Sequence, residues 1–405
     1  MKNIFNFFCL SLLKIISFFL IIKIGEIETR SVGHYSKSID LYLAEKKFFK
    51  KKIDNKFTLE IWFPNKFAAN KFLLEKWKNF LFILPYNKFL NYLFVNFFFF
   101  LKKKKSRRIF LVDYRDWREV KDWQIRDIHK IYMKSEQNIF FSEKEIQVGE
   151  ETLKKIVTNY SANTKLICVH ARDSLYHSYK DTSDIKKNKN WQDKFRNVNI
   201  NNFIKGISLA NSQNYTVIRV GNIQEKKIEL DKKKFNFFDY TFSEYKSDFM
   251  DFFLAYKASL YLGSDSGVVM FPGLFRKEMM MHNVISVGIL GDFDDSTCSL
   301  VNFKKIYSKK LKRLLTFSEN YKLNIVKFND EDFFLNELEV IESSEDEIEN
   351  FMQECMWIKQ DKNNSYFNSE LQKKVKNLTK YLNISEMNNI RISPYFLNKH
   401  KDLIK

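Results

Sequence analysis

Three short apolar runs from residue 165 onward, each ending at a polar or glycine-containing turn, give the strongest indication of the fold. They occupy residues 165–169 (KLICV), 216–220 (TVIRV) and 259–262 (SLYL). Segments 200–212 and 248–257 lie between these runs and carry apolar residues at helical spacing. Short buried strands that alternate with helices are typical of a parallel sheet covered by helices.

The N-terminal part shows the same alternation. Strands are predicted at 20–27, 57–63 and 109–112, and helices at 36–47 and 68–80. Two successive units of this kind predict an α/β fold with two Rossmann-like domains facing a cleft.

This interpretation divides the chain into four segments. They are an N-terminal membrane anchor or interfacial helix (1–19), a first Rossmann-like domain (20–155) with an apolar and basic membrane-facing segment (80–108), a second Rossmann-like domain (156–335) and a C-terminal helical extension (336–405).

Three further elements are predicted in the C-terminal half. A strand is expected at 283–289, and a helix is expected to open after Gly267. Ser344 with Glu347 has the spacing of a capping box, and the apolar stripe of a helix follows it.

Composition narrows the class of protein. The chain has 405 residues, 45% of them hydrophobic, which is enough for a large core in about two or three domains. Its four cysteines show no paired spacing, which argues against a disulfide scaffold or a zinc ribbon. The formal net charge of +19 requires an acidic partner, such as nucleic acid, anionic lipid or a phosphorylated substrate.

Two apolar segments point to a membrane. Residues 4–20 are marginal in length for a span and fit an inserted anchor or an interfacial helix, and their end also fits a first strand. Residues 91–101 (NYLFVNFFFFL) precede a Lys/Arg cluster at 102–108, as an in-plane helix on an anionic leaflet would. A buried core helix is the rival interpretation of the second segment.

The first candidate site follows the strand at 165–169. His170, Arg172 and Asp173 come at its carboxyl end, where open α/β sheets bind ligands. An Arg fork matches a phosphate bidentately, Asp173 could orient it, and His170 could donate to a phosphate or a sugar hydroxyl. The alternative is a structural Arg–Asp pair that holds the following loop.

The second candidate is the turn 263–267 (GSDSG), which follows another strand. Its glycines would let the backbone approach a ligand, and Asp265 could bind a ribose or sugar hydroxyl. An ordinary strand-to-helix turn looks similar. The chain has no Walker A motif and no dinucleotide-binding glycine motif, which argues against a nucleotide hydrolase or a nicotinamide enzyme. The residues of the turn are Gly263, Ser264, Asp265, Ser266 and Gly267.

Other titratable residues carry less information. His34 lies in the loop after the first strand and could serve as a general base or contact an acceptor, or it could simply cap a helix. The pair Asp292 and Asp294 matches a diphosphate-metal site only by chance, and His282 with Asn283 is interpreted as helix-end packing. No histidine has the ligand spacing of a zinc site.

Taken in order along the chain, these motifs resemble a family of bacterial glycosyltransferases linked to surface-polysaccharide and lipopolysaccharide gene clusters. The similarity runs from about residue 20 to residue 404. The matching pieces include Arg30 to His34, DLYL (40–43), CVHARDSLY (168–176), RNVNINN (196–202), YTVIRVG (215–221), LGSDSG (262–267), PGLF (272–275) and ISPYFL (392–397).

That family distantly resembles fucosyltransferases of the glycosyltransferase B fold, which hold a guanosine-diphosphate sugar with a His-x-Arg-Arg-x-Asp element. Here the element is His170-Ala171-Arg172-Asp173, with one Arg and with the Asp one place closer. The resemblance implies an inverting, metal-independent transfer without a cofactor. It assigns phosphate neutralisation to Arg172, the acceptor to the domain 20–155 and the nucleotide sugar to the domain 156–335.

The expected activity is therefore transfer of a hexosyl or fucosyl group from a nucleoside-diphosphate sugar to a glycan or lipid-linked acceptor. The expected location is the cytoplasmic face of the inner membrane, peripheral or held by one N-terminal anchor, with no nucleic-acid partner. A basic nucleic-acid- or membrane-binding scaffold without catalysis is the alternative. His34 and Arg172 are the expected catalytic residues, and further substrate contacts are expected from Tyr176, Arg196, Asn197 and Arg219.

Overall fold

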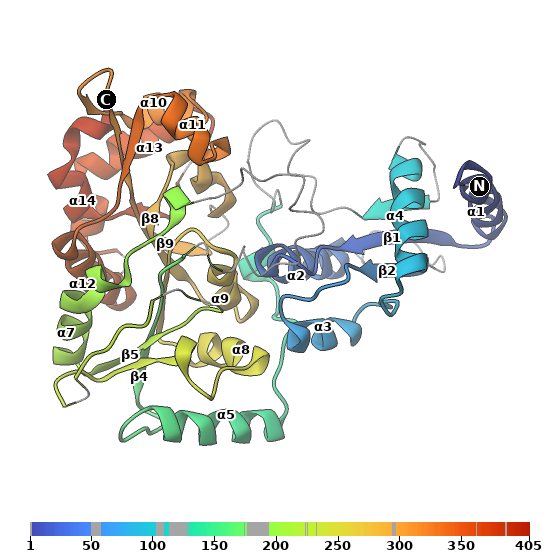
Figure 1. Ribbon diagram of the computed structural model, residues 1–405, viewed down its shortest axis with the longest axis horizontal. Helices are drawn as coiled ribbons and strands as arrows, with labels where there is room; N and C mark the ends of the chain where they lie inside the picture. Colours follow the sequence, from blue (N-terminus) through green and yellow to red (C-terminus); the bar gives the residue numbers. More distant parts are fainter. Residues whose placement is uncertain are drawn as a thin grey trace. The chain divides into compact units, whose positions relative to one another are not determined.

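The computed structural model of the 405-residue chain divides into two compact units, unit 1 (Met1–Lys121) and unit 2 (Asp122–Lys405) (Figure 1). The structure describes residues 2–49, 58–102, 109–112, 127, 129–173, 175, 194–222, 224, 226–231, 233–293, 297–361, 363–384 and 387–405.

Unit 1 is built on a parallel sheet in the order β2-β1-β3. Its central strand pairs with both neighbours, Ile24 lying opposite Ile61 on one side and Leu111 on the other. Gly25 is needed at its position, because a Cβ there would lie 2.4 Å from the Trp62 ring. The elements are α1 (Lys2–Ile16), β1 (Ile21–Ile27), α2 (Val32–Phe49), β2 (Thr58–Pro64), α3 (Lys71–Lys78), α4 (Lys88–Lys102) and β3 (Ile109–Val112).

One face of this sheet is covered by α4, which in turn packs against α1. Ile22, Ile24 and Phe63 of the sheet form a core with Phe97 and Phe98 of α4. The 91–101 segment is therefore in part a core helix, as its rival interpretation expected. None of the described helices is long and apolar enough to cross a membrane.

In the described part of unit 2, seven parallel strands form one sheet in the order β13-β9-β8-β7-β4-β5-β6. The strands are β4 (Lys165–His170), β5 (Tyr215–Arg219), β6 (Phe237–Asp239), β7 (Leu260–Gly263), β8 (Met279–Val284), β9 (Cys298–Phe303) and β13 (Arg391–Ile392). An antiparallel sheet of β10 (Lys305–Ser308), β11 (Arg313–Leu314) and β12 (Leu338–Ile341) accompanies it.

Helices cover both faces of the large sheet. Ile167 and Val169 of β4 face α7 (Ile204–Ser212) and α12 (Glu345–Gln360), whose stripe includes Phe351. The intervening Cys168 lies on the α8 (Asp248–Lys257) side, since its Sγ is 3.7 Å from the Leu254 carbonyl oxygen. This is the doubly wound α/β arrangement expected from the strand–helix alternation. The other helices are α5 (Glu143–Ile156), α9 (Phe271–Leu274), α10 (Phe317–Lys322), α11 (Asp330–Leu335), α13 (Glu370–Tyr381) and α14 (Pro394–Lys399).

The unit boundary lies between Lys121 and Asp122, not between 155 and 156. The reason is α5, which packs on α8: Gly149 lies against the Phe253 ring, and Glu150 forms a 2.7 Å ion pair with Lys257. Likewise the 336–405 segment is more than a helical extension. It supplies β12, the edge strand β13 and the core helix α12, which begins with the predicted Ser344–Glu347 capping box.

Three predictions about the region after β7 differ from the structure. The strand expected at 283–289 is β8, which lies four residues earlier, because the Met279–Met281 run is buried and Asn283 has a left-handed φ of 54°. Asn283 and His282 therefore end a strand, not a helix. The helix expected after Gly267 is a 3-10 turn (Gly267–Met270) followed by the four-residue α9.

Candidate functional site

The large sheet of unit 2 has one topological switch point, between β4 and β7. From β4 the chain adds β5 and β6 on one side, and from β7 it adds β8, β9 and β13 on the other. In doubly wound sheets, ligands bind outside the carboxyl ends of the strands at such a point. The two candidate motifs, 170–173 and 263–267, follow β4 and β7 directly. The switch point therefore lies where the sequence places its polar turns.

Hydrogen bonds tie the two motifs together. The Arg172 amide donates to Ser264 Oγ at 2.8 Å, and the Ser264 amide donates to the His170 carbonyl at 3.1 Å. Gly263 is required beneath this link, because a Cβ there would lie 2.1 Å from Val269 Cγ1. Ser264 thus links the ends of β4 and β7, and its hydroxyl accepts a hydrogen bond from the Arg172 amide. The residues joined by these hydrogen bonds, and by those of Arg196 with Asp265, are called the bracket below.

A third segment joins this network. Arg196 donates from one guanidinium nitrogen to the Asp265 carbonyl at 2.7 Å and to its carboxylate at 2.8 Å. The Val198 amide donates to the Arg172 carbonyl at 2.9 Å. The 194–199 loop, the β4 turn and the β7 turn are therefore one hydrogen-bonded assembly. Asp265 pairs with Arg196 within it.

His170 is buried in this assembly, with 3% of its surface exposed. Its Nδ1 lies 3.0 Å from the Val220 carbonyl and must donate, so in the neutral ring Nε2 carries no proton. The pKa of His170 is lowered to about 4, mainly by burial; the Val220 hydrogen bond opposes this shift, and the nearby Arg219 and Arg172 charges contribute to it. Nε2 is buried without a hydrogen-bond partner among the described residues. In this tautomer Nε2 can accept a hydrogen bond but cannot donate one.

His282 supports the same strand end from β8. Its Nε2 lies 3.0 Å from the His170 carbonyl, and its Nδ1 lies 3.3 Å from the Asn283 side-chain nitrogen. Burial lowers the pKa of His282 to about 3. A neutral His282 that donates to His170 and accepts from Asn283 satisfies both contacts. It is a structural residue of the switch point.

Arg219 ends β5, and its guanidinium is occupied by the protein. It donates to the Asp239 carboxylate at 3.1 Å, to the Lys226 carbonyl at 2.6 Å and to Gln224 at 2.8 Å. Its side chain is 2% exposed and does not face solvent. Arg219 anchors the loop that follows β5.

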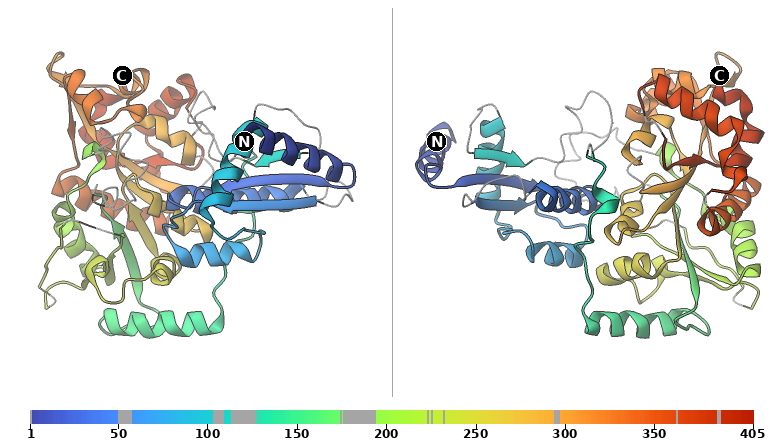
Figure 2. Two further views of the ribbon diagram at one scale, coloured as in Figure 1. Left: turned by 45° about the vertical axis from the view of Figure 1, so that its right-hand side comes forward. Right: turned by 180° about the vertical axis from the view of Figure 1, so that it is seen from behind.

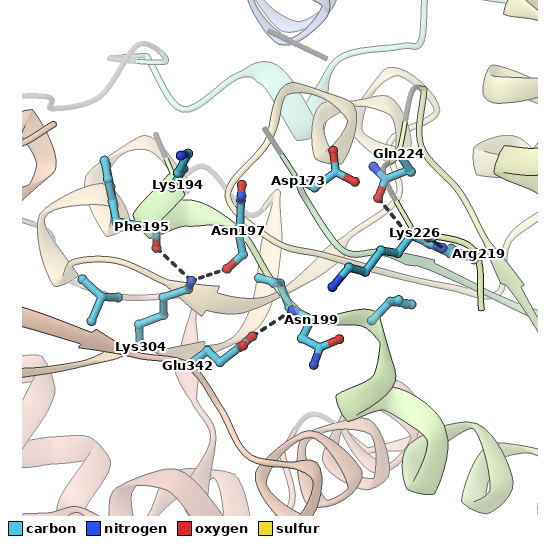
Figure 3. Close-up of a pocket in the computed structure, with 13 residues that line it drawn as sticks. Asp173, Lys194, Phe195, Asn197, Asn199, Arg219, Gln224, Lys226, Lys304 and Glu342 are labelled. Carbon is cyan, nitrogen blue, oxygen red and sulfur yellow. Dashed lines mark hydrogen bonds between the residues drawn. The ribbon is translucent and has the colours of Figure 1, made fainter. Parts of the chain in front are cut away.

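A pocket of about 400 Å³ opens beside the switch point, entirely within unit 2 (Figure 3). This size lies within the range of small-molecule sites. Four of its lining residues are Lys or Arg and two are acidic, so the lining is net basic. The lining residues are Asp173, Lys194, Phe195, Asn197, Val198, Asn199, Ile200, Arg219, Gln224, Lys226, Lys304, Val340 and Glu342.

Lys304 directly follows β9 and holds one wall of this pocket. Its Nζ donates to the carbonyls of Phe195, at 2.8 Å, and Asn197 (Figure 3). Burial lowers the pKa of Lys304 to about 8; Glu342 opposes this shift and the Arg172 charge adds to it. The opposite side carries the exposed Lys226, which extends into the space between the walls (Figure 3).

The structure separates the predicted site residues into groups. Asp173, Asn197 and Arg219 line the pocket. Six others form the bracket, namely His170, Arg172, Arg196, Gly263, Ser264 and Asp265. Ser266 and Gly267 begin the 3-10 turn that follows it. Tyr176 lies outside the described residues. His34 belongs to unit 1, in the first turn of α2, where its amide donates to the Ser31 carbonyl at 2.9 Å.

Sequence reasoning missed several pocket residues, among them Lys194, Lys226 and Lys304. A signal for Lys304 was present, because this lysine follows the buried strand β9 as Arg172 follows β4. No such signal marks Lys194 or Lys226, which look like the many other loop lysines of a basic chain. Among the described residues, no group of three His, Cys, Asp or Glu is placed to hold a metal ion.

No protein-family model matches this chain, and no curated protein matches it either. Among solved structures, the wall teichoic acid polymerase TagF superposes with a TM-score of 0.26 and 8% sequence identity, covering 84% of this chain and 87% of that chain. A superposition of this quality carries no argument for a shared fold or activity. The site is therefore interpreted from its own residues.

Proposed function

We propose that unit 2 binds a nucleoside-diphosphate sugar and that the chain transfers the sugar to a glycan or lipid-linked acceptor in surface-polysaccharide synthesis. The observation that carries this proposal is a net basic pocket of about 400 Å³ at the carboxyl edge of a doubly wound sheet, beside its switch point. Such an edge is where α/β folds hold phosphorylated ligands. The motif resemblance supports the same class of donor.

The chemistry of the lining suggests a division of roles. Lys194 and Lys226 would bind the diphosphate as compact charges. Asp173 would accept from ribose or sugar hydroxyls, and Phe195 with Val340 would contact the base. In the transfer, the bond between the sugar C1 and the diphosphate oxygen breaks while the acceptor oxygen bonds to C1 and gives up its proton. The cations would stabilise the departing diphosphate.

The expected roles of Arg172 and His34 are part of this proposal. Arg172 is 4% exposed and sits in the bracket, so it would act by positioning the loop and by adding positive potential. His34 would serve as acceptor contact or base. Hexosyl or fucosyl specificity, inversion and metal independence belong to the same proposal and come from the resemblance.

Thermal shift with a panel of nucleotide sugars tests the donor site. We expect one sugar nucleotide to raise the melting temperature, and we expect Lys226→Ala and Arg172→Ala to weaken that shift. Lys309→Ala with Lys310→Ala is the matched control, since both lysines are exposed and neither lines the pocket. This control should keep the full shift.

Two outcomes would contradict the proposal. One is an absence of stabilisation by any sugar nucleotide together with a strong, salt-dependent shift with RNA, which would favour the basic scaffold instead. The other is an undiminished shift in both pocket and bracket variants. Mass spectrometry of products from a donor and acceptor screen would then identify the transferred sugar.

A further inference from the structure

Helix α1 of unit 1 has apolar residues on two opposite faces. Its inner face, with Cys9, Leu10, Leu13 and Ile16, packs into the core that α4 forms with the sheet. Figure 2 shows α1 lying against α4. This inner face accounts for the amphipathic pattern that any surface helix needs.

The outer face of α1 is apolar as well. Ile4, Phe7, Phe8, Leu12 and Ile15 recur at helical spacing and are 48–75% exposed. A surface helix ordinarily carries polar residues at such positions. Phe18 and Phe19, in the turn after α1, are 76% and 81% exposed.

The resulting patch is larger than a monomer usually exposes. Each of these Phe side chains offers on the order of 100 Å² of apolar surface, and the seven residues together offer roughly 700 Å² or more. The largest patch on a typical monomer is about 300–600 Å² and often marks an interaction site. The outer face of α1 therefore has the size of a docking surface.

Charge identifies the kind of partner. Residues 1–25 and 76–112, which contain α1, α4 and β3, include no Asp or Glu but many Lys and Arg. Lys14, on α1, and Lys88, at the start of α4, are exposed. Next to Lys88, the exposed Phe89 and Tyr92 extend the aromatic surface of the unit. Aromatic side chains bordered by lysines, without acidic residues, fit the interface of an anionic bilayer.

We propose that α1 lies in the plane of an anionic membrane interface, with its outer face inserted and its inner face kept on α4. A helix of 15 residues is about 22 Å long, shorter than the hydrocarbon core of about 30 Å. An upright α1 would also give up its packing on α4. Of the two possibilities left open for the 4–20 segment, the interfacial one is favoured. The proposal does not depend on the donor site of unit 2.

Vesicle sedimentation of the full chain tests the proposal. We expect the protein to pellet with phosphatidylcholine vesicles containing phosphatidylglycerol, and to bind much less to pure phosphatidylcholine. Phe7→Ser with Phe8→Ser should weaken partitioning at least tenfold. Lys14→Glu should weaken it severalfold on anionic vesicles only.

The matched control is Phe334→Ser with Leu335→Ser in α11 of unit 2, where the two side chains are 81% and 68% exposed. It removes equivalent apolar surface and should leave vesicle binding unchanged. All variants alter exposed side chains, so their melting temperatures should match the parent and report intact folding. Two results would overturn the proposal: undiminished binding by the α1 variant, or a chain that ignores vesicles and dimerises unless Phe7 and Phe8 are changed.

Discussion

Strands β4 and β5 are neighbours in the large sheet, and an arginine lies at or just after the carboxyl end of each. The two arginines make different contacts. At β5, the Arg219 guanidinium donates hydrogen bonds to Asp239, Gln224 and the Lys226 carbonyl. At β4, the backbone of Arg172 is bracketed by Ser264 and Val198. The Arg219 contacts hold the loop that follows β5, and the Arg172 contacts fix the turns beside the pocket.

The two arginines therefore differ in kind: the protein takes up the side-chain donors of Arg219, whereas the backbone of Arg172 joins two turns. We expect an arginine whose donors the fold already satisfies to contribute to stability and not to ligand binding. By this criterion we propose that the ligand-binding charges are the loop lysines that line the pocket, Lys194 and Lys226. Four measurements test this division between stability and binding.

The largest effect is expected from removing the Arg219 guanidinium at the end of β5. Arg219→Leu would leave the Asp239 carboxylate buried at 6% exposure beside an apolar side chain. Removing one partner of a buried ion pair costs about 3–5 kcal/mol of unfolding free energy. Urea denaturation measures this loss. Arg219→Leu with Asp239→Leu should recover much of it, and a single variant as stable as the parent would refute a structural role.

The second effect concerns binding alone. Lys194→Ala with Lys226→Ala removes two charged donors from the pocket and should weaken the sugar nucleotide roughly thirtyfold, about 2 kcal/mol. Both side chains are exposed, so the unfolding free energy should change by less than about 0.5 kcal/mol. Titration calorimetry at two salt concentrations measures the affinity. A loss of stability without a loss of affinity would reverse the assignment.

A third effect is the acid sensitivity of the switch point. The pKa values of His170 and His282 are lowered to about 4 and about 3 by burial, so the unfolded chain takes up protons near pH 6.5 that the folded chain does not. Their stabilisation is complete above pH 6.5 and is lost as the pH falls below it. Between pH 7.5 and 5.5 the loss should be about 1.3 kcal/mol for each histidine.

Denaturation of a His282→Gln variant at both pH values isolates the contribution of His282 to the pH dependence, because the Gln amide can still donate to the His170 carbonyl. The variant should lose about half of the pH dependence. The Glu319 carboxyl does not interfere, since Arg313 lowers its pKa to about 2 and its contribution is constant above pH 4.5. A slope equal to that of the parent would mean that other groups govern this pH range.

Local signals in the sequence were enough to predict much of the sheet and part of the site. β1, β4 and β5 lie within a residue of their expected bounds, since each is a buried run ended by a turn. The Ser344 capping box is confirmed for the same reason, because its two partners are three residues apart. That the 170–173 and 263–267 motifs meet follows from parallel strands ending at one edge.

Non-local contacts account for what could not be predicted. The unit boundary depends on α5 packing against Phe253, about a hundred residues later in the chain. The strand β8 was misplaced because its Met279–Met281 run has no β-branched residue, while the Ile- and Val-containing stretch after it looked more like a strand. Which loop lysines reach the pocket depends on how the 194–199 loop is held by Lys304, a contact that spans more than a hundred residues.

The smallest expected effect probes Lys304 itself. Burial lowers its pKa to about 8, so the charge it adds to the pocket is mostly present at pH 7 and mostly absent at pH 9. Affinity for the sugar nucleotide should therefore fall roughly threefold over this range, about 0.7 kcal/mol, because the neutral amine keeps its contacts with the loop carbonyls but loses its Coulomb attraction. Calorimetric titrations at both pH values measure the change. Lys304→Arg keeps its charge at pH 9 and should flatten the profile; a profile that still falls would place the titrating group elsewhere in the pocket.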